Sequence, residues 1–313
     1  MRFVWRVALT LSAMLAGHVA LADSPTPRLN PVIELLQQGK PAFGLYAPSN
    51  LRHGAPPAEL ARTTVSYKYA DFIFDGSMEY DFDQSFPTFA AYSRALYAEN
   101  PRAYPLIVKI HEIAPDPELA ARHIGQQLDL GVSAVTFVGV ESAEEVRRGI
   151  AAMRFKSHGG TRSDSVGFAP TFWGLSEPEY RRRADVWPLN PDGELLSWVI
   201  VESHAGLQNV RAIAAVKGIG VLWPGAGTLR QVFSTRDAAG RAVVDEVAWE
   251  AAIQKVLAAC KEFKVPCGIP SSPDQIQKRL QQGFSVFLMN WGESGFQTIE
   301  IGRRLRSASD ARG

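Results

Sequence analysis

The 313-residue sequence has little cysteine, with only Cys260 and Cys267, and almost no net charge, with 33 Lys and Arg against 32 Asp and Glu. A near-neutral chain gives no global electrostatic reason to bind nucleic acid or an anionic membrane surface, so we expect neither as a partner. The motifs GxGxxG, GxxxxGK[ST], HExxH and GxSxG are also missing. The sequence therefore offers no motif evidence for dinucleotide, P-loop, HExxH-metallopeptidase or GxSxG-hydrolase chemistry.

The first 22 residues differ from the remainder. Arg2 and Arg6 precede the apolar run Val7–Leu15, and the small residues at 20–22 suit a signal peptidase. We predict a cleaved signal peptide at 1–22 and a periplasmic or secreted protein. The alternative is an uncleaved membrane anchor. The apolar run is short for this role, because a membrane span needs about 20 residues. Cleavage removes two arginines and changes the net charge from +1 to −1, because Lys and Arg fall from 33 to 31 against 32 acids.

The two cysteines lie close together in the sequence. In a chain that matures in an oxidising compartment, Cys260 and Cys267 can form a short-loop disulfide. The alternative is two buried thiols, one at a helix end and one in a strand. The sequence does not decide between them, because it does not give the distance between the two Cα atoms.

Apolar runs alternate with amphipathic stretches through residues 23–313. The runs predict strands at Phe43–Tyr46, Phe72–Phe74, Leu106–Ile110, Ala134–Val138, Trp198–Val201, Ile219–Trp223, Cys267–Ile269 and Val286–Leu288. The helical patterns between them include Phe86–Glu99, Pro117–Leu130, Ser142–Met153, Gln208–Val216, Glu246–Phe263 and Ser272–Gln282. Eight such units over about 270 residues predict an α/β fold with one (β/α)₈ TIM barrel domain. The rival architecture is an open doubly wound sheet.

One segment breaks this alternation. Residues 156–194 form a long connection rich in Gly, Pro, Arg and aromatic residues. We interpret it as a connection on the ligand-binding face of the barrel, where it would serve as a lid or an arm between subunits.

Polar residues gather at or just past the ends of the predicted strands, where a barrel has its ligand-binding mouth. They are Ser49, Asn50, Asp75 to Asp81, Lys109, His111, Glu112, Glu202 to His204, Gly225, Gly227, Thr228, Asn290, Trp291 and Glu293. Glu202 is a candidate ligand or catalytic carboxylate, or else part of a structural ion pair. Lys109 is a candidate anion-binding group or a barrel salt bridge. His111 comes two residues later and would face the same side of the strand as Lys109. It is a candidate site residue, and the alternative is a structural histidine.

Several segments together resemble the HpcH/HpaI aldolase/citrate lyase family. They are the Asn30-Pro31 helix start with Gly39-Lys40-Pro41 and Phe43 to Tyr46, then Phe72 to Asp75, Leu128 to Gly131 with Val140 to Glu145, and Val201 to Ser203 with Ala212 to Gly218. The resemblance runs from about residue 29 to 305. It implies a barrel of the phosphoenolpyruvate/pyruvate type, assembly into trimers or hexamers, and a divalent Mg²⁺, Mn²⁺ or Co²⁺ ion that binds a 2-oxo acid and stabilises its enolate.

The resemblance also implies residue roles. Glu202 matches the metal-binding glutamate of the family, and Lys109 stands where the family has an arginine that grips the substrate. Ala226, Gly227 and Thr228 fall in the turn that contacts substrate.

Two positions depart from the family pattern. The second metal-binding residue, an aspartate in the family, is Gly227 here, and the acid/base histidine is replaced by Met78 or Tyr80. His111 and Glu79 are candidates to supply the missing imidazole and carboxylate. The predicted catalytic set is therefore Lys109, His111, Glu79 and Tyr80.

From these residues we predict a secreted carbon–carbon lyase that acts on a small 2-oxo acid or related aldol, with Mg²⁺ or Mn²⁺ in an altered site. Two alternatives stay open. One is a non-catalytic binding or assembly protein that keeps the barrel, which Gly227 and the missing histidine favour. The other is a metal-independent lyase or hydrolase that uses Lys109 and its polar neighbours.

Overall fold

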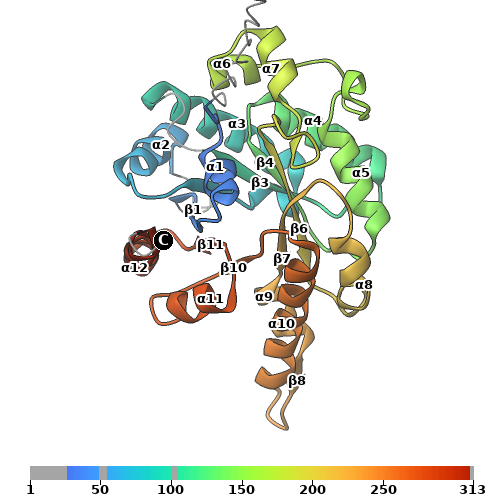
Figure 1. The fold of residues 1–313 in the computed structure, drawn as a ribbon, viewed down its shortest axis with the longest axis vertical. Coiled ribbons are helices and arrows are strands. Elements are labelled where there is room, and N and C mark those ends of the chain that lie inside the picture. Colours follow the sequence, from blue (N-terminus) through green and yellow to red (C-terminus); the bar gives the residue numbers. More distant parts are fainter. Residues whose placement is uncertain (1–26, 49–54, 101–104, 311–313) are drawn as a thin grey trace, which may run out of the picture.

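The computed structural model describes residues 27–48, 55–100 and 105–310, and in this part of the chain no helix is long and apolar enough to cross a membrane. The predicted signal peptide at 1–22 lies outside the described residues. The fold is built on parallel strands that curl around a common axis (Figure 1). These strands are β1 (Ala42–Tyr46), β2 (Phe72–Asp75), β3 (Leu106–Ile110), β4 (Ala134–Phe137), β6 (Leu195–Val201), β7 (Ile219–Pro224), β10 (Gly268–Pro270) and β11 (Val286–Met289).

The sheet follows the order β10, β11, β1, β2, β3, β4, β6, with β7 paired to β6. A parallel bridge between Leu222 and Cys267 then joins β7 to the start of β10, and the Leu222 N–H donates to the Pro266 carbonyl at 2.9 Å. The first and last strands, β1 and β11, are also paired. The prediction of an eight-stranded barrel is confirmed, and the open doubly wound alternative is wrong.

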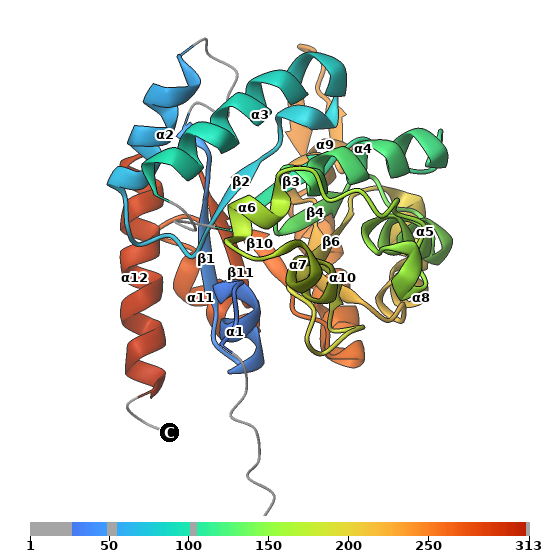
Figure 2. The same ribbon diagram turned by 90° about the horizontal axis from the view of Figure 1, so that it is seen from above.

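The helices surround the strands, with α12 beside β1 and α5 and α8 beside β4 and β6 (Figure 2). Their bounds are α1 (Pro31–Gln37), α2 (Pro57–Ser66), α3 (Phe82–Glu99), α4 (Pro117–Asp129), α5 (Ala143–Met153), α8 (His204–Ala214), α9 (Ala226–Val232), α10 (Glu246–Phe263), α11 (Ile276–Gln282) and α12 (Glu293–Asp310). Polar N-cap side chains start several of them. Asn30, Asp81, Asp116, Ser142, Ser203 and Asp245 each accept a hydrogen bond from a first-turn N–H.

Two layers of apolar side chains hold the barrel together. The outer layer lies between strands and helices, and the inner layer fills the barrel. Inside, Trp198 stacks on Trp223 with ring centroids 5.6 Å apart and meets Phe72 edge-on at 5.3 Å. The barrel is therefore a packed core, and a ligand can enter only near one end of the strands.

The long connection 156–194 follows α5 and leads into β6, so it enters β6 at the amino end of that strand. It contains α6 (Ala169–Trp173), α7 (Glu177–Arg183) and the short strand β5 (Val186–Trp187). Helix-to-strand connections lie on the amino-terminal face of a barrel. The expectation that this segment covers the ligand-binding face is wrong, because a helix comes before it and a strand comes after it.

Buried ion pairs fix this connection to the barrel. Arg154 holds Asp185 with two hydrogen bonds of 2.6 and 3.0 Å, and Arg183 contacts Glu194 at 2.6 Å. Glu194 also accepts from the Asn30 N–H at 2.9 Å, at the start of α1. Such pairing of buried charges indicates a structural role for the segment.

A hairpin of β8 (Ser234–Arg236) and β9 (Ala242–Val244) lies between α9 and α10 and projects from the body of the molecule (Figure 1). The sequence patterns did not predict this hairpin, and they did not predict helices α2, α6, α9 and α12. Short polar strands carry little of the apolar alternation on which strand prediction depends.

Of the two alternatives for the cysteines, the structure has the disulfide. Cys260 in α10 and Cys267 next to β10 are bonded, with their Cα atoms 5.7 Å apart. Cys267 is also the residue that bridges to Leu222 at the closure of the barrel. The disulfide therefore fixes α10 to the seam between β7 and β10.

Removing this disulfide should destabilise the protein. Chain entropy for so short a loop predicts a loss of roughly 2–3 kcal/mol in the free energy of unfolding. We expect the double variant Cys260→Ala and Cys267→Ala to show this loss in urea unfolding. As a control, dithiothreitol should lower the stability of the wild type and leave the double variant unchanged. Equal stability of oxidised and fully reduced wild type, with reduction checked by thiol counting, would contradict the prediction.

Candidate active site

A cavity of about 190 Å³ opens at the carboxyl ends of the strands. It is lined by Tyr46, Phe74, Lys109, Thr136, Trp198, Ile200, Glu202, Trp223, Gly225, Ala226, Gly227, Thr228, Pro270 and Leu288. Most of these residues are on the inward-facing positions of the barrel strands. This end of a (β/α)₈ barrel is where ligands bind, so the cavity is the candidate active site.

Lys109 brings a positive charge into this cavity from β3. Its Nζ lies 2.8 Å from Oε2 of Glu79, and the two side chains are only 17% and 13% exposed. Burial by itself would lower the pKa of Lys109, but the carboxylate of Glu79 outweighs it, with smaller help from Tyr46 and Glu202, and the pKa is raised above its usual value. Lys109 is therefore a permanent cation.

Glu79 is positioned by the turn that follows β2. Ser77 donates to the Asp75 carboxylate through its backbone N–H at 3.1 Å and its hydroxyl at 2.5 Å, and the Ser85 hydroxyl donates to the Ser77 carbonyl at 2.9 Å. These bonds fix the 3₁₀ turn Ser77–Glu79 over the end of the strand. The Glu79 carboxylate is held against Lys109 as a result.

Glu202 is at the carboxyl end of β6 and is partly buried. Its Oε1 accepts a hydrogen bond from the Gly139 N–H at 2.9 Å. A Cβ on Gly225 would lie 2.6 Å from the other carboxylate oxygen, so only glycine leaves room for this side chain. Backbone geometry just past β4 and β7 therefore places the carboxylate at the cavity wall.

The predicted substrate-binding residues also lie at this cavity. Ala226, Gly227 and Thr228 form the first turn of α9 and line the wall beside Glu202. A Cβ added to Gly227 would meet no atom within 4 Å. The position where the family pattern has an aspartate is therefore open space.

Two residues of the predicted catalytic set lie elsewhere. The Nε2 of His111 is 3.0 Å from Nδ1 of His123 on α4, because β3 ends at Ile110 and the alternation of the strand stops before His111. Tyr80 is 81% exposed and does not line the cavity. The sequence-predicted mouth residues Ser49 and Asn50 lie outside the described residues.

The donor set at the cavity does not fit the divalent metal that the family resemblance implies. Within the described ranges, no three His, Cys, Asp or Glu side chains lie close enough together to hold an ion. Glu202 is the carboxylate among the cavity-lining residues, and Gly227 offers no side chain.

Sequence reasoning missed Thr136 and Trp198, which line the cavity from within β4 and β6. Apart from Lys109, the predicted site residues all lie just past the strand ends. The register of the strands would have identified the two missed residues, because Thr136 pairs with Lys109 on β3 and with Trp198 on β6, which places all three at the same level of the barrel.

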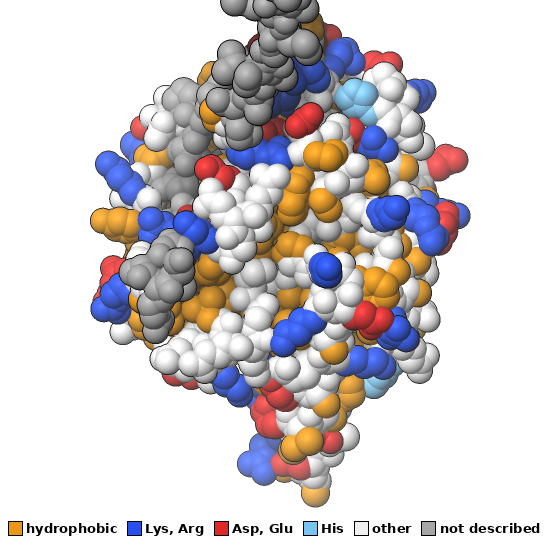
Figure 3. Space-filling model, viewed as in Figure 1, with side chains coloured by type: hydrophobic (Ala, Val, Ile, Leu, Met, Phe, Trp, Pro, Cys, Tyr) orange, Lys and Arg blue, Asp and Glu red, His pale blue; other side chains and the backbone are white. Residues whose placement is uncertain are grey.

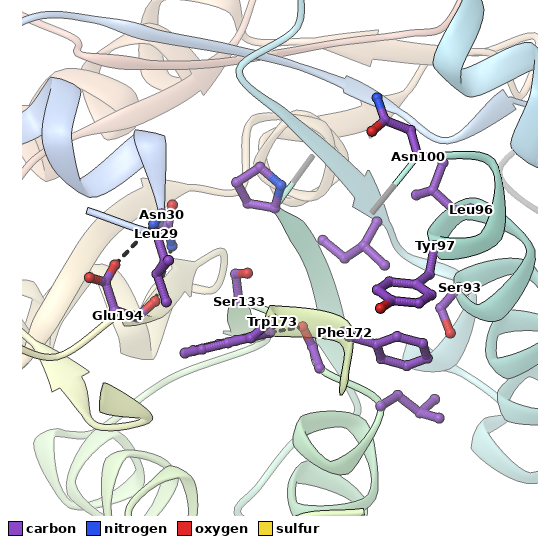
Figure 4. A pocket seen from close by; sticks show the side chains of 14 residues that line it. Leu29, Asn30, Ser93, Leu96, Tyr97, Asn100, Ser133, Phe172, Trp173 and Glu194 are labelled. Carbon is purple, nitrogen blue, oxygen red and sulfur yellow. Dashed lines mark hydrogen bonds between the residues drawn. The ribbon is translucent and has the colours of Figure 1, made fainter. Parts of the chain in front are cut away.

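A second cavity, of about 80 Å³, lies at the opposite end of the barrel, under the 156–194 connection (Figure 4). Two of its polar side chains already bond to the protein, since Trp173 donates to the Gly131 carbonyl at 2.9 Å and Glu194 accepts from the Asn30 N–H. No cluster of titratable side chains marks this cavity as a reaction site among the residues described.

Hydrophobic side chains gather in the middle of the face that Figure 1 presents (Figure 3).

Comparison with known proteins adds independent information. The family model for HpcH/HpaI aldolase/citrate lyase matches residues 89–300. A hydroxypyruvate/pyruvate aldolase from Delftia acidovorans is 28% identical over 252 residues, covering 80% of this chain and 81% of that protein. One of the same name from Chromohalobacter salexigens is 32% identical over 123 residues, covering 39% of this chain and only 44% of that relative.

Solved structures agree in fold. An HpcH/HpaI aldolase/citrate lyase family protein from Burkholderia cenocepacia superposes with a TM-score of 0.64, covering 90% of this chain and 97% of that one. Its sequence identity is 20%, so this likeness concerns the fold alone. The family model, by contrast, matches more than half of the sequence, at positions that include the Lys109 strand, Glu202 and the Gly227 turn. The chain belongs to the HpcH/HpaI aldolase/citrate lyase family.

Proposed function

We propose that the protein is a carbon–carbon lyase that acts on a 2-oxo acid at the cavity between Lys109 and Glu202. The observation that carries the proposal is a buried ammonium and a carboxylate on the walls of one cavity at the catalytic end of the barrel. Two relatives are named hydroxypyruvate/pyruvate aldolases, which supports the substrate class.

Cleavage next to a 2-oxo acid leaves electrons on the carbonyl oxygen, so the site needs positive charge there. In this proposal Lys109 supplies it, since the described carboxylates do not complete a metal site. A lysine paired with Glu79 at 2.8 Å stays protonated. Lys109 is therefore better suited to act as a fixed positive charge than as a nucleophile, since a nucleophilic amine must be unprotonated. Lys109 therefore stabilises the enolate without forming a Schiff base.

Glu202 serves as the proton acceptor. For a 4-hydroxy-2-oxo acid, the carboxylate takes the proton of the hydroxyl group, the bond between C3 and C4 breaks, and an aldehyde forms. The electron pair of that bond moves to the enolate beside Lys109, and a proton then adds to C3 to give the 2-oxo acid product. The Gly139 N–H holds one carboxylate oxygen, which leaves the other to exchange the proton.

Lys109→Met and Glu202→Gln should separate these roles. We expect Lys109→Met to lose about 100-fold or more in kcat/KM, because the charge next to the enolate is lost. Glu202→Gln should lower kcat by about 10²- to 10⁴-fold with less effect on KM. Retro-aldol assays with a panel of 4-hydroxy-2-oxo acids measure both.

Glu262→Gln is the matched control, since Glu262 is paired with Arg211 on the outside of the barrel. It should leave the kinetics unchanged. Full activity in Lys109→Met would refute the proposal, and so would trapping of a Schiff base on Lys109 by borohydride. If the wild type cleaves none of the panel and binds none of it, the non-catalytic binding or assembly protein becomes the better hypothesis.

The metal requirement has its own test. We expect the wild type to bind Mn²⁺ only weakly in calorimetric titration, and Gly227→Asp to bind it more tightly, because an aspartate there enters open space near Glu202. Gly240→Asp, on the hairpin turn, is the control for an added carboxylate. Tight Mn²⁺ binding by the wild type that Glu202→Gln abolishes would instead favour the altered metal site.

We also propose that the protein is exported to the periplasm and assembles into trimers or hexamers. The sequence pattern of a signal peptide at 1–22 supports export, and a disulfide is expected in an oxidising compartment. Protein expressed from the full gene and recovered from a periplasmic extract should start at residue 23 by intact mass. Light scattering should give three or six times the chain mass. A full-length cytoplasmic monomer would refute both statements.

A further inference from the structure

Three residues that carry hydrogen-bond donors line the cavity from neighbouring strands at the same level of the barrel. Lys109 on β3 is in register with Thr136 on β4, and Thr136 is in register with Trp198 on β6. All three line the cavity. Neighbouring strands lie about 4.8 Å apart, so an ammonium, a hydroxyl and an indole N–H form a row across the wall. We call Lys109, Thr136 and Trp198 the donor row.

Two members of the donor row have no hydrogen-bond partner within the described part of the chain. Thr136 is fully buried, Trp198 is 1% exposed, and neither Oγ1 nor Nε1 finds an acceptor. Other buried hydroxyls are satisfied, for example Thr64 by the Leu60 carbonyl at 2.8 Å and Ser197 by the Gly218 carbonyl at 2.7 Å. An unsatisfied buried polar group costs about 1–3 kcal/mol. Two such groups side by side in a ligand cavity point to an acceptor that arrives with the ligand.

The Trp198 indole cannot easily turn away from this position. Its ring stacks on Trp223 with an interplanar angle of 15° and packs edge-on against Phe72. Phe74 also lies against it, at 5.9 Å between centroids. The N–H direction is therefore fixed by packing before any ligand binds, which avoids the entropic cost of ordering the donor.

We propose that Thr136 and Trp198 donate hydrogen bonds to the carboxylate of the 2-oxo acid, with Lys109 as the third donor. This proposal rests on the proposed function and adds the orientation of the substrate. The carboxylate lies deep in the barrel against the donor row, and the bond that breaks faces Glu202 at the mouth. Since a neutral ester or amide carries no charge to match the row, the site selects free acids.

Thr136→Val tests this, because valine has the shape of threonine without the hydroxyl. Two effects of opposite sign are expected. The melting temperature of the ligand-free protein should rise, since an unsatisfied buried hydroxyl is removed. The affinity for oxalate, a two-carbon dianion used as the probe, should fall about tenfold in calorimetric titration. This is the effect expected when one hydrogen bond to a charged acceptor is lost.

Trp198→Phe removes the indole N–H and keeps an aromatic ring in the stack. It should also weaken oxalate binding about tenfold, and in lyase assays both variants should raise KM more than they lower kcat. Thr64→Val is the matched control, because its hydroxyl is buried and bonded away from the cavity. It should lower the melting temperature and leave oxalate binding unchanged.

Two results would overturn the inference. One is a wild type that does not bind oxalate, and the other is unchanged oxalate affinity in both Thr136→Val and Trp198→Phe. Failure of the proposed function gives a different result. In that case oxalate binds the wild type and weakens in both variants, while no 2-oxo acid of the panel is cleaved, so the carboxylate site stands without the lyase reaction.

Discussion

The structure of the candidate site depends on one buried positive charge. An ammonium inside a barrel packed with aromatic rings is costly unless a carboxylate offsets it, and Glu79 does so at 2.8 Å. That requirement explains the ordered turn after β2, in which Asp75 and Ser77 hold Glu79 in place. The residues that hold Lys109 therefore set the chemistry of the whole cavity.

Glycine provides the space for the opposing negative charge. Any side chain at position 225 would collide with Glu202, and Gly227 leaves the neighbouring position empty. The cavity thus has a cation on β3 and a carboxylate at the carboxyl end of β6, with open space at Gly227 in the first turn of α9. This separation of charge suits a reaction in which an oxygen becomes negative at one wall and a proton leaves at the other.

Much of the fold could be predicted from sequence because local patterns determine it. The apolar run Leu106–Ile110 and the helix Glu246–Phe263 have the predicted bounds, and α1 begins at the helix start Asn30-Pro31. The site was harder to predict. His111 was assigned to the mouth by extending a two-residue alternation past the end of its strand, and the turn sends it to His123 instead. Thr136 and Trp198 were missed because strand register is a property of three-dimensional pairing, which no single segment encodes.

Groups inside the cavity lower the stability of the ligand-free protein, and a disulfide outside the cavity raises it. Two unsatisfied donors at Thr136 and Trp198 cost free energy in the ligand-free state, and the charge pair contributes little net stability. The Cys260–Cys267 disulfide lies at the seam where the Leu222–Cys267 bridge closes the ring, away from these groups. A covalent closure at the seam lets the interior keep donors that only a ligand satisfies. The strands at this seam also shape the cavity, since Trp223 on β7 and Pro270 on β10 line it, so the disulfide stabilises the wall against which the Trp198 ring is stacked.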